Sequence, residues 1–209
     1  MKFAKYIVAM TQSEVEFFDN LAPRWDSDEI RSTPERINAV LDLLSIRKGD
    51  KVLDLGTGTG VLLPYLSVRV GEEGEVTGVD LSEGMLSRAI EKYGNLGNVR
   101  FLRLDFEEEN LPGEYDAVLL YSVFPHLHRP EATFGRLFER NVRPGGRVVV
   151  AFPSDERFIN AIHEHRQSES GRLPSAPRLA ELIRSWGYDA DVAAYSEDLY
   201  VIIVSRHGR

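Results

Sequence analysis

The chain of 209 residues is long enough for one globular domain, and its 43% hydrophobic and 28% charged residues fit a folded rather than a disordered protein. A net charge of −8 at pH 7 leaves no excess of basic residues to neutralise phosphates, which disfavours a nucleic-acid substrate. The sequence lacks cysteine, a long apolar run and a signal-peptide pattern, so it excludes disulfides and thiol chemistry and predicts a cytoplasmic protein with no membrane span.

Two helices are predicted at the start of the chain. The segment "SEVE", residues 13–16, has the spacing of a capping box and opens a short helix that includes Phe17 and Phe18. A second helix begins at "TPER", where Thr33 is the predicted N-cap and Pro34 lies in the first turn. Apolar residues then recur at i, i+3, i+4 and i+7, which indicates that this helix buries one face.

From residue 51 onward, short apolar runs alternate with helical patterns. We predict strands at "KVLDL", "EVTGVD", "NVRFLRLD", "YDAVLLYS" and "RVVVAF", and helices at residues 61–70, at residues 85–93 and from residue 130. A turn, "RPGG", is expected just before the last of these strands. Strands that are apolar throughout and alternate with helices are typical of a parallel sheet covered on both faces.

The end of the chain breaks this alternation. After a helix that carries Leu179, Leu182 and Ile183, the runs "YDADVAAY" and "LYVIIVS" are separated only by "SED". So short a link allows an antiparallel hairpin but no crossover helix. The sequence therefore predicts a doubly wound α/β domain, with a seven-stranded, mostly parallel sheet whose last strand is antiparallel.

The segment "VLDLGTGTG", residues 52–60, reads as a strand that stops in a glycine-rich turn and enters a helix. Gly56 and Gly58 let the backbone turn sharply and approach a ligand closely, and the helix start offers unpaired N–H groups. No Gly-Lys-Ser/Thr follows, so the segment is not a P-loop. Strand, glycines and helix alone are shared by nicotinamide enzymes, flavoproteins and methyltransferases.

Acidic residues mark the ends of the first three predicted strands. Asp80 ends the second strand about twenty residues after the glycines, where such folds bind ribose hydroxyls. Asp54 and Asp105 lie at or near the ends of the first and third strands, and ligands bind outside these ends. Val61 stands where a dinucleotide-binding motif has its third glycine. This arrangement favours adenosine held at its ribose and base, with little provision for a pyrophosphate.

These segments resemble the motifs of the class I S-adenosylmethionine (SAM)-dependent methyltransferases. "VLDLGTGTG", "GVDLSEGML", "FLRLDFEEENLP" and "YDAVLLYSVFPHL" are similar to the first four motifs of that family, in order and at matching spacings. "VRPGGRVVVAF" is similar to its fifth strand, and "FFDNLAPRWDS" resembles the start of small-molecule methyltransferases such as the quinone-biosynthesis enzymes. The resemblance covers most of residues 14–205 and implies a Rossmann-like methyltransferase fold, SAM as cofactor and a small-molecule methyl acceptor.

The resemblance also implies roles for particular residues. It places the glycines around the methionine part of SAM, Asp54 near its amino group and Asp80 at the ribose hydroxyls. Flanking residues would contact the adenine, and Asp105 would accept a hydrogen bond from the adenine amino group. The end of the fourth strand would lie near the sulfonium. The cofactor-binding residues predicted in this way are Asp54, Gly56, Gly58, Gly60, Asp80, Leu81, Met85, Asp105, Phe106, Tyr121 and Ser122.

We predict a single domain of residues 1–209, in which residues 1–48 form a helical lid or cap on a core of residues 49–209. By the resemblance, Phe17, Phe18 and Trp25 would close over the cofactor, and Trp25 would also contact the acceptor. The alternative is that these aromatic side chains only pack the first helix onto the sheet.

Four of the five histidines occur in two pairs, "FPHLH" and "HEH". The pairs follow the fourth and fifth predicted strands, so we expect both at the carboxyl edge of the sheet, where an acceptor would bind. Methyl transfer from a sulfonium is a direct displacement, and an acceptor that must also lose a proton is served by a histidine near neutral pH. We predict His126 as the general base and His128 and His163 as acceptor contacts.

Other interpretations of the chain remain open. The histidines would be solvated or capping residues, or ligands of a metal; we predict no metal, because "FINAIHEHR" looks helical and i, i+2 positions do not share a helix face. A nicotinamide-dependent oxidoreductase would use the same sheet, but it calls for glycine at Val61 and a catalytic Tyr-x-x-x-Lys that we do not find. A non-catalytic SAM- or metal-binding regulatory protein is the third reading.

Overall fold

The computed structural model describes residues 14–28, 31–165 and 171–208. The strands are β1 (Lys51–Leu55), β2 (Glu75–Asp80), β3 (Val99–Arg103), β4 (Tyr115–Tyr121), β5 (Val142–Phe152), β6 (Tyr188–Tyr195) and β7 (Tyr200–Arg206). The α-helices are α2 (Trp25–Asp28), α3 (Pro34–Asp42), α4 (Leu63–Val70), α5 (Glu83–Tyr93), α6 (Pro130–Arg136), α7 (Glu156–His165) and α8 (Ala176–Ser185). Short helical turns are η1 (Ala22–Arg24), η2 (Phe124–His126) and η3 (Leu137–Asn141), and a further helix covers residues 14–21.

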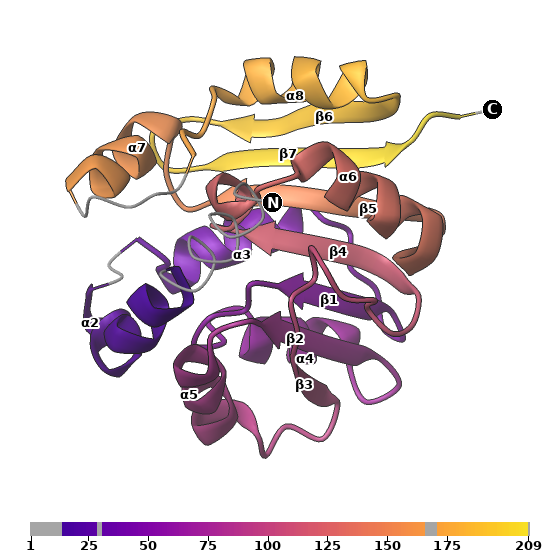
Figure 1. Cartoon of the computed structure of the whole chain (residues 1–209). Helices are drawn as coiled ribbons and strands as arrows, with labels where there is room; N and C mark the ends of the chain where they lie inside the picture. Colours follow the sequence, from indigo (N-terminus) through magenta and orange to yellow (C-terminus); the bar gives the residue numbers. More distant parts are fainter. Residues whose placement is uncertain (1–13, 29–30, 166–170, 209) are drawn as a thin grey trace, which may run out of the picture.

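The seven strands form one sheet in the order β3-β2-β1-β4-β5-β7-β6 (Figure 1). β1 pairs in parallel with β2 and β4, and β7 pairs antiparallel with both β5 and β6. The predicted doubly wound sheet with an antiparallel last strand is therefore confirmed. The strand order reverses between β1 and β4, which is the point where ligands bind in open α/β sheets.

Helices cover both faces of the sheet, as the apolar strands predict. On one face, Phe134 of α6 and Ile183 of α8 belong to the same buried cluster as Leu53 of β1. On the other face, Leu66 of α4 packs with Val52, the neighbour of Leu53 on the same strand. Adjacent residues of β1 thus point into opposite cores, so helices cover both faces of this strand.

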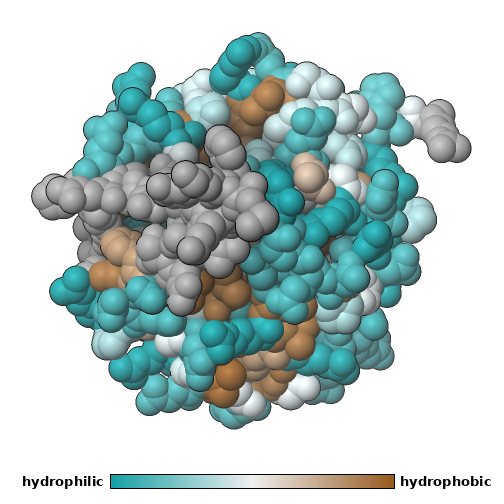
Figure 2. Space-filling view, in the orientation of Figure 1, coloured by the Kyte–Doolittle hydropathy of each residue, from teal (hydrophilic) through white to brown (hydrophobic). Residues whose placement is uncertain are grey.

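The link between β3 and β4 contains a loop in place of a helix (Figure 1). Leu104, Phe106 and Leu111 of this loop are half-buried against the core that contains α6 and α8. Hydrophobic surface gathers on the same side of the molecule, over the half of the sheet that holds β2 and β3 (Figure 2). The loop therefore covers this end of the sheet only in part.

The N-terminal helices begin for local reasons. The side chain of Thr33 accepts a hydrogen bond from the Arg36 N–H and caps α3, as predicted. The apolar face of α3, which includes Ile37 and Val40, is buried on the sheet with α4. The helix predicted from "SEVE" is present over residues 14–21, while Ser13 lies outside the described residues. α3 is thus part of the sheet's covering layer, and the segment before it leads toward the site.

Two predicted elements differ in extent from those observed. α4 starts at Leu63 rather than at Val61, because the Gly60 N–H and the Leu63 N–H are engaged in turn hydrogen bonds that carry the chain out of the glycine loop. β5 already starts at Val142, which pairs with Tyr115, so the "RPGG" turn is an irregularity within the strand rather than its beginning. Among the described helices, none has the length and apolarity needed to cross a membrane.

Candidate active site

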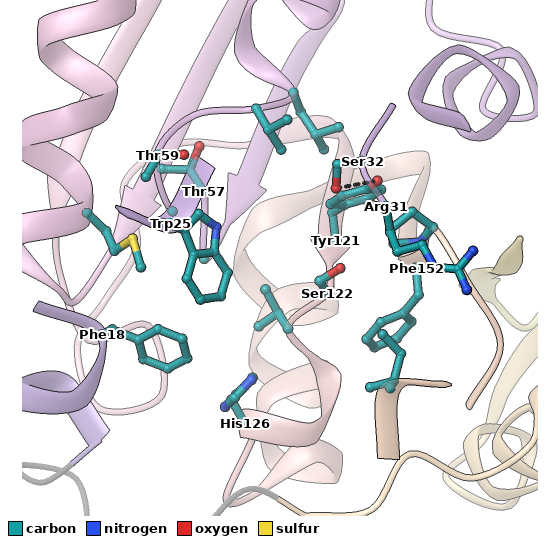
Figure 3. A pocket seen from close by; sticks show the side chains of 18 of the residues that line it. Phe18, Trp25, Arg31, Ser32, Thr57, Thr59, Tyr121, Ser122, His126 and Phe152 are labelled. Carbon is teal, nitrogen blue, oxygen red and sulfur yellow. Dashed lines mark hydrogen bonds between the residues drawn. The ribbon is translucent and has the colours of Figure 1, made fainter. Parts of the chain in front are cut away.

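A cavity of about 530 Å³ opens at the carboxyl ends of β1, β2, β4 and β5. One side, here called the strand wall, consists of residues at the ends of β1 and β2 and in the glycine turn, namely Asp54, Gly56, Thr57, Gly58, Thr59 and Asp80. The other side, here called the helix wall, consists of apolar side chains from the N-terminal segment and α7, namely Phe17, Phe18, Trp25, Phe158, Ile159 and Ile162. Residues after β4 also line the cavity, among them Ser122 and His126 (Figure 3).

The glycine turn adopts a conformation that few other residues permit. Gly56 and Gly58 have φ angles of 68° and 56°, in the left-handed region. A Cβ on Gly56 would lie 2.5 Å from Cγ2 of Val123, so the turn packs directly against the segment after β4. A Cβ on Gly58 would meet nothing within 4 Å, because this residue faces the cavity. The turn thus presents bare backbone to whatever occupies the cavity.

Asp80 holds the turn in place from the end of β2. Its Oδ2 accepts from the Gly58 N–H at 2.7 Å, and its Oδ1 accepts from the Ser82 N–H at 2.9 Å. Burial raises the pKa of Asp80 above its ordinary value, while these N–H donors act in the opposite direction. The Asp80 carboxylate is therefore held between the glycine turn and the start of α5, and it faces the cavity.

Asp54 is the most deeply buried acid of the strand wall, with 2% of its surface exposed. Burial raises the pKa of Asp54 to about 7, although a 2.7 Å hydrogen bond from the Thr57 hydroxyl to Oδ2 opposes the shift. The charge of Asp80 adds to the shift. A cationic group in the cavity would stabilise the charged form of Asp54, because it would replace the solvation that burial removes.

The end of β4 brings two further predicted residues to the cavity. Ser122 has a φ angle of 59°, which is unusual for a residue with a side chain and places strain at the point where the strand ends. The Tyr121 hydroxyl donates to Oγ of Ser32 at 3.2 Å, at the rim of the cavity opposite Phe18 (Figure 3). This contact joins β4 to the segment that precedes α3.

The N-terminal segment is attached to the start of α5 and to the glycine turn by two carboxylates. Oδ1 of Asp19 accepts from the Ser82 hydroxyl at 2.5 Å and from the Gly84 N–H at 2.8 Å, both at the start of α5. Oδ1 of Asp26 accepts from the Thr59 hydroxyl at 2.5 Å, and its Oδ2 lies 2.9 Å from Nζ of Lys92. Burial opposes ionisation of Asp26, but these hydrogen bonds and the charge of Lys92 lower its pKa overall.

The aromatic residues of the N-terminal segment form a small cluster of their own. The cluster is separate from the two main cores. In it, Phe17, Phe18 and Trp25 pack against Leu21 and Ala22 of the same segment and against Met85 of α5. The rings of Phe18 and Trp25 meet edge to face at 5.7 Å. Because the same three side chains line the cavity, they both pack the segment onto α5 and form part of the helix wall.

His126 lines the cavity from the turn after β4 (Figure 3). Its Nδ1 lies 2.7 Å from Oε1 of Glu14, and its ring meets Phe18 edge to face at 5.2 Å. The side chains of His126 and Glu14 are only 20% and 17% exposed. The imidazole is therefore held by a carboxylate and an aromatic ring that both belong to the N-terminal segment.

The other predicted histidines occupy different environments. His128 does not line the cavity; its Nδ1 lies 3.1 Å from Oε2 of Glu107, whose carboxylate also accepts from the N–H groups of His128 and Arg129. His163 lies in α7, as does His165, but both side chains fall outside the described residues. Among the side chains that the structure describes, no group of three or more histidines and acids is arranged to hold a metal.

The cavity brings together seven of the eleven predicted cofactor-binding residues and leaves four outside its lining. Gly60 is buried against Leu63 and Tyr93, where a Cβ would lie 2.9 Å and 3.0 Å from their side chains. Asp105 accepts from the Glu107 N–H at 2.9 Å, in a local turn beyond the end of β3. The four residues that do not line the cavity are Gly60, Leu81, Asp105 and Phe106.

Several residues that line the cavity have no signal in the sequence. Phe152 at the end of β5 and Phe158 of α7 line the cavity, and the guanidinium of Arg31 lies 4.0 Å above the Phe158 ring. Arg31 also lies 3.9 Å from Asp198, on the loop between β6 and β7. The amphipathic pattern of α7 is readable, but its apolar face gives no indication of whether it meets a core or a cavity.

Comparisons with known proteins agree with this geometry. The family described as "Methyltransferase domain" matches residues 52–146. The ubiquinone/menaquinone biosynthesis C-methyltransferase UbiE of Yersinia enterocolitica is 33% identical over 154 residues, which cover 68% of this chain and 61% of that protein. The UbiE protein of Yersinia pestis matches with the same identity and coverage. The chain thus spans about three fifths of the length of these curated relatives.

Solved structures show the same fold. The complex of DhpI with SAH superposes with a TM-score of 0.74 at 24% identity, and the match covers 95% of this chain and 97% of that one. A SAM-dependent methyltransferase from Aquifex aeolicus superposes with a TM-score of 0.67 at 25% identity, covering 83% and 93% of the two chains. From its four motifs in order, its strand order and these matches, we conclude that the chain belongs to the class I SAM-dependent methyltransferase family.

Proposed function

We propose that this protein transfers a methyl group from SAM to a small-molecule acceptor, with His126 as the general base. The observation that carries the proposal is that the strand wall and His126 line one and the same cavity. At about 530 Å³ the cavity is within the usual size range of small-molecule sites, which is roughly 300–1,000 Å³. Its apolar helix wall suits a small acceptor better than a highly charged polymer.

In this proposal the strand wall binds the cofactor. The bare backbone of Gly56 and Gly58 allows close approach of the methionine part, whose ammonium group would compensate the buried charge of Asp54. Asp80 would accept from the ribose hydroxyls. The residues present fit SAM in chemical type, because they offer carboxylates to its cationic and hydroxyl groups, and the described lining residues include no cluster of cations for a pyrophosphate.

The helix wall would position the acceptor behind the methyl group and exclude water. The aromatic side chains of Phe18, Trp25 and Phe158 surround this part of the cavity. Direct displacement needs alignment of the nucleophile more than it needs covalent help from the enzyme. His126 lines the same cavity and would take the proton that the acceptor loses.

The cofactor assignment is tested by calorimetry with S-adenosylhomocysteine (SAH) on metal-stripped protein. We expect micromolar binding, which Asp80→Ala weakens at least about tenfold because a buried, charged hydrogen-bond acceptor is lost. Asp80→Asn serves as the shape-preserving companion, and thermal unfolding of both variants checks that the fold is kept. Unchanged SAH affinity in a folded Asp80→Ala variant would contradict the ribose assignment, and absence of SAH binding to the wild type would contradict the proposed function.

The base assignment is tested with His126→Ala. We expect the affinity for SAH to change by less than about threefold, because the ring is assigned to the acceptor and not to the cofactor. Methyl transfer to an acceptor found by screening with radiolabelled SAM should slow by about a hundredfold or more. His207→Ala is the matched control, because this exposed histidine pairs with Asp189 far from the cavity. Loss of SAH binding in His126→Ala would instead place the ring in the cofactor site.

A further inference from the structure

The helix over residues 14–21 contacts the cavity at two separate points. Near one end, Asp19 accepts from the Ser82 hydroxyl and the Gly84 N–H. Ser82 also donates its N–H to Asp80, which is predicted to bind the cofactor ribose. At the other end, Glu14 meets His126. One short helix therefore links the predicted ribose site to the proposed base.

The contact between Glu14 and His126 fixes more than the position of the ring. An ionised carboxylate offers only acceptor atoms, so at 2.7 Å from Oε1 of Glu14 the Nδ1 of His126 must carry the proton. In a neutral ring the lone pair is then on Nε2. Both side chains are mostly buried, and the local dielectric is lower than in water, which strengthens the interaction.

The surroundings of the pair favour the same arrangement. The edge-to-face contact with Phe18, a neighbour of Glu14 on the same helix, restricts rotation of the imidazole. Oε2 of Glu14 lies 3.7 Å from Nε2 of His128, and Glu107 engages the opposite nitrogen of that ring. Carboxylates and imidazoles thus alternate in a row, in the order Glu107, His128, Glu14 and His126.

We propose that Glu14 is a positioning residue for methyl transfer, which holds His126 as the Nδ1–H tautomer and directs Nε2 at the acceptor. This inference rests on the proposed function. In the reaction the acceptor's bond to hydrogen breaks and the proton moves to Nε2, while the freed electron pair forms the new bond to the methyl carbon. The pair of the breaking carbon–sulfur bond stays on sulfur and yields SAH, and the imidazolium is balanced by Glu14.

The contact between Glu14 and His126 depends on how the N-terminal helix lies on the cavity. His126 and the helix that carries Glu14 are connected through space and not through neighbouring sequence, since 112 positions separate the two residues. The base is complete only when this helix sits on the cavity, where Asp19 also attaches it beside the cofactor site. The attachment beside the predicted cofactor site and the orientation of the base therefore depend on the same helix.

The experiment is a ¹⁵N-detected NMR measurement of the histidine rings in the SAH-bound full chain, in buffer alkaline enough for the rings to be neutral. We expect the Nδ1–H tautomer for wild-type His126, although the Nε2–H form is the usual one in solution. A wild-type His126 in the Nε2–H form would overturn the proposal without any variant. His207, paired with Asp189, is an internal reference that no change at Glu14 should affect.

Two variants separate the role of Glu14 from a general effect on the helix. Glu14→Ala should shift His126 to the Nε2–H form, whereas Glu14→Gln should keep the Nδ1–H form because its amide oxygen still accepts the hydrogen bond. Glu16→Ala is the matched control, since this exposed glutamate lies on the same helix. A folded Glu14→Ala variant that retains the Nδ1–H form would refute the positioning role.

Calorimetry with SAH keeps this outcome distinct from the test of the function. If the wild type binds SAH but the tautomer of His126 does not depend on Glu14, the positioning role fails and the proposed function stands. If the wild type does not bind SAH, the proposed function fails first. Glu14→Ala itself should change the SAH affinity by less than about threefold, because Glu14 contacts the base and not the strand wall.

Discussion

The strand wall and the helix wall of the cavity are built in different ways. The polar groups of the strand wall bond to one another, as Asp54 does to Thr57 and Asp80 does to the Gly58 N–H. The helix wall is mainly apolar and comes from the N-terminal segment and α7, and the guanidinium of Arg31 lies over the Phe158 ring of α7. The first wall is fixed once the sheet folds, whereas the second can vary without disturbing it.

The difference indicates how one fold serves many acceptors. A site on strand ends holds its geometry because each strand is fixed by neighbours on both sides, as β1 is by β2 and β4. A site on helices that lie on top of the sheet depends on a few contacts, and its side chains are free to change with the acceptor. We expect substitutions in the strand wall to affect stability and cofactor binding, and those in the helix wall to affect acceptor use.

The largest expected effect is the pH dependence that Asp54 gives to folding. Burial raises its pKa from 3.8 to about 7, so the folded state holds the proton more tightly than the unfolded state. This contribution to stability is present at low pH and is lost as the pH rises from about 4 to 7, at a cost of up to about 4 kcal/mol. Urea denaturation across this range should show the decline, and Asp54→Asn should remove most of it.

A matched control for this prediction is Asp42→Asn. Asp42 is exposed and pairs with Arg69 on the surface, so this variant removes one carboxylate without touching the strand wall. Asp80, whose pKa burial also raises, accounts for any remaining slope in Asp54→Asn. If the stability of Asp54→Asn declines with pH as steeply as that of the wild type, the charge of Asp54 is compensated in the fold and burial does not raise its pKa as we infer.

The next largest effect separates packing from ligand approach within the strand wall. Gly56→Ala should lower the free energy of unfolding by about 2–3 kcal/mol, because its Cβ would collide with Val123 and its φ angle is positive. Gly58→Ala should cost only about 1 kcal/mol, since its Cβ meets no atom within 4 Å. The added methyl group of Gly58→Ala instead points into the cavity, so SAH binding should weaken more than folding does.

Urea denaturation and SAH calorimetry should show opposite effects in the two glycine variants if Gly56 serves packing and Gly58 serves ligand approach. The variant at Gly56 loses mainly stability, and the folded fraction still binds SAH. The variant at Gly58 loses mainly affinity. Equal losses of affinity in both, with little change in stability, would show that the turn adapts to the added methyl group and is not fixed by Val123.

The sequence predicted the strand wall because its signals are local. A capping residue such as Thr33, or an acid at the end of an apolar run such as Asp80, is defined by its immediate neighbours in the chain. The same local pattern does not indicate where a side chain lies. Asp105 ends a predicted strand just as Asp80 does, yet β3 stops at Arg103 and the loop carries Asp105 outside the cavity lining.

The helix wall was only partly predictable, because it depends on contacts between distant segments. Nothing near Phe158 in the sequence indicates that α7 lies over the ends of β4 and β5, and nothing near Glu14 indicates a histidine partner. Such contacts follow from how helices pack on the finished sheet. A pattern of charged residues before an aromatic pair, as in "SEVEFF", is equally typical of an ordinary surface helix.

The smallest predicted effect concerns the attachment of the N-terminal helix to the start of α5, beside the strand wall. Asp19→Asn removes the charge from the acceptor of the Ser82 hydroxyl and the Gly84 N–H, while the amide oxygen can still accept one of these bonds. A loss of about 1 kcal/mol in this attachment should speed SAH dissociation about fivefold in stopped-flow fluorescence, with Trp25 as the reporter. Asn20→Ala is the matched control, because this residue is exposed on the same helix. If Asp19→Asn leaves SAH dissociation unchanged while Asp80→Asn alters it, the strand wall holds the cofactor without help from the N-terminal helix, and the two walls act independently.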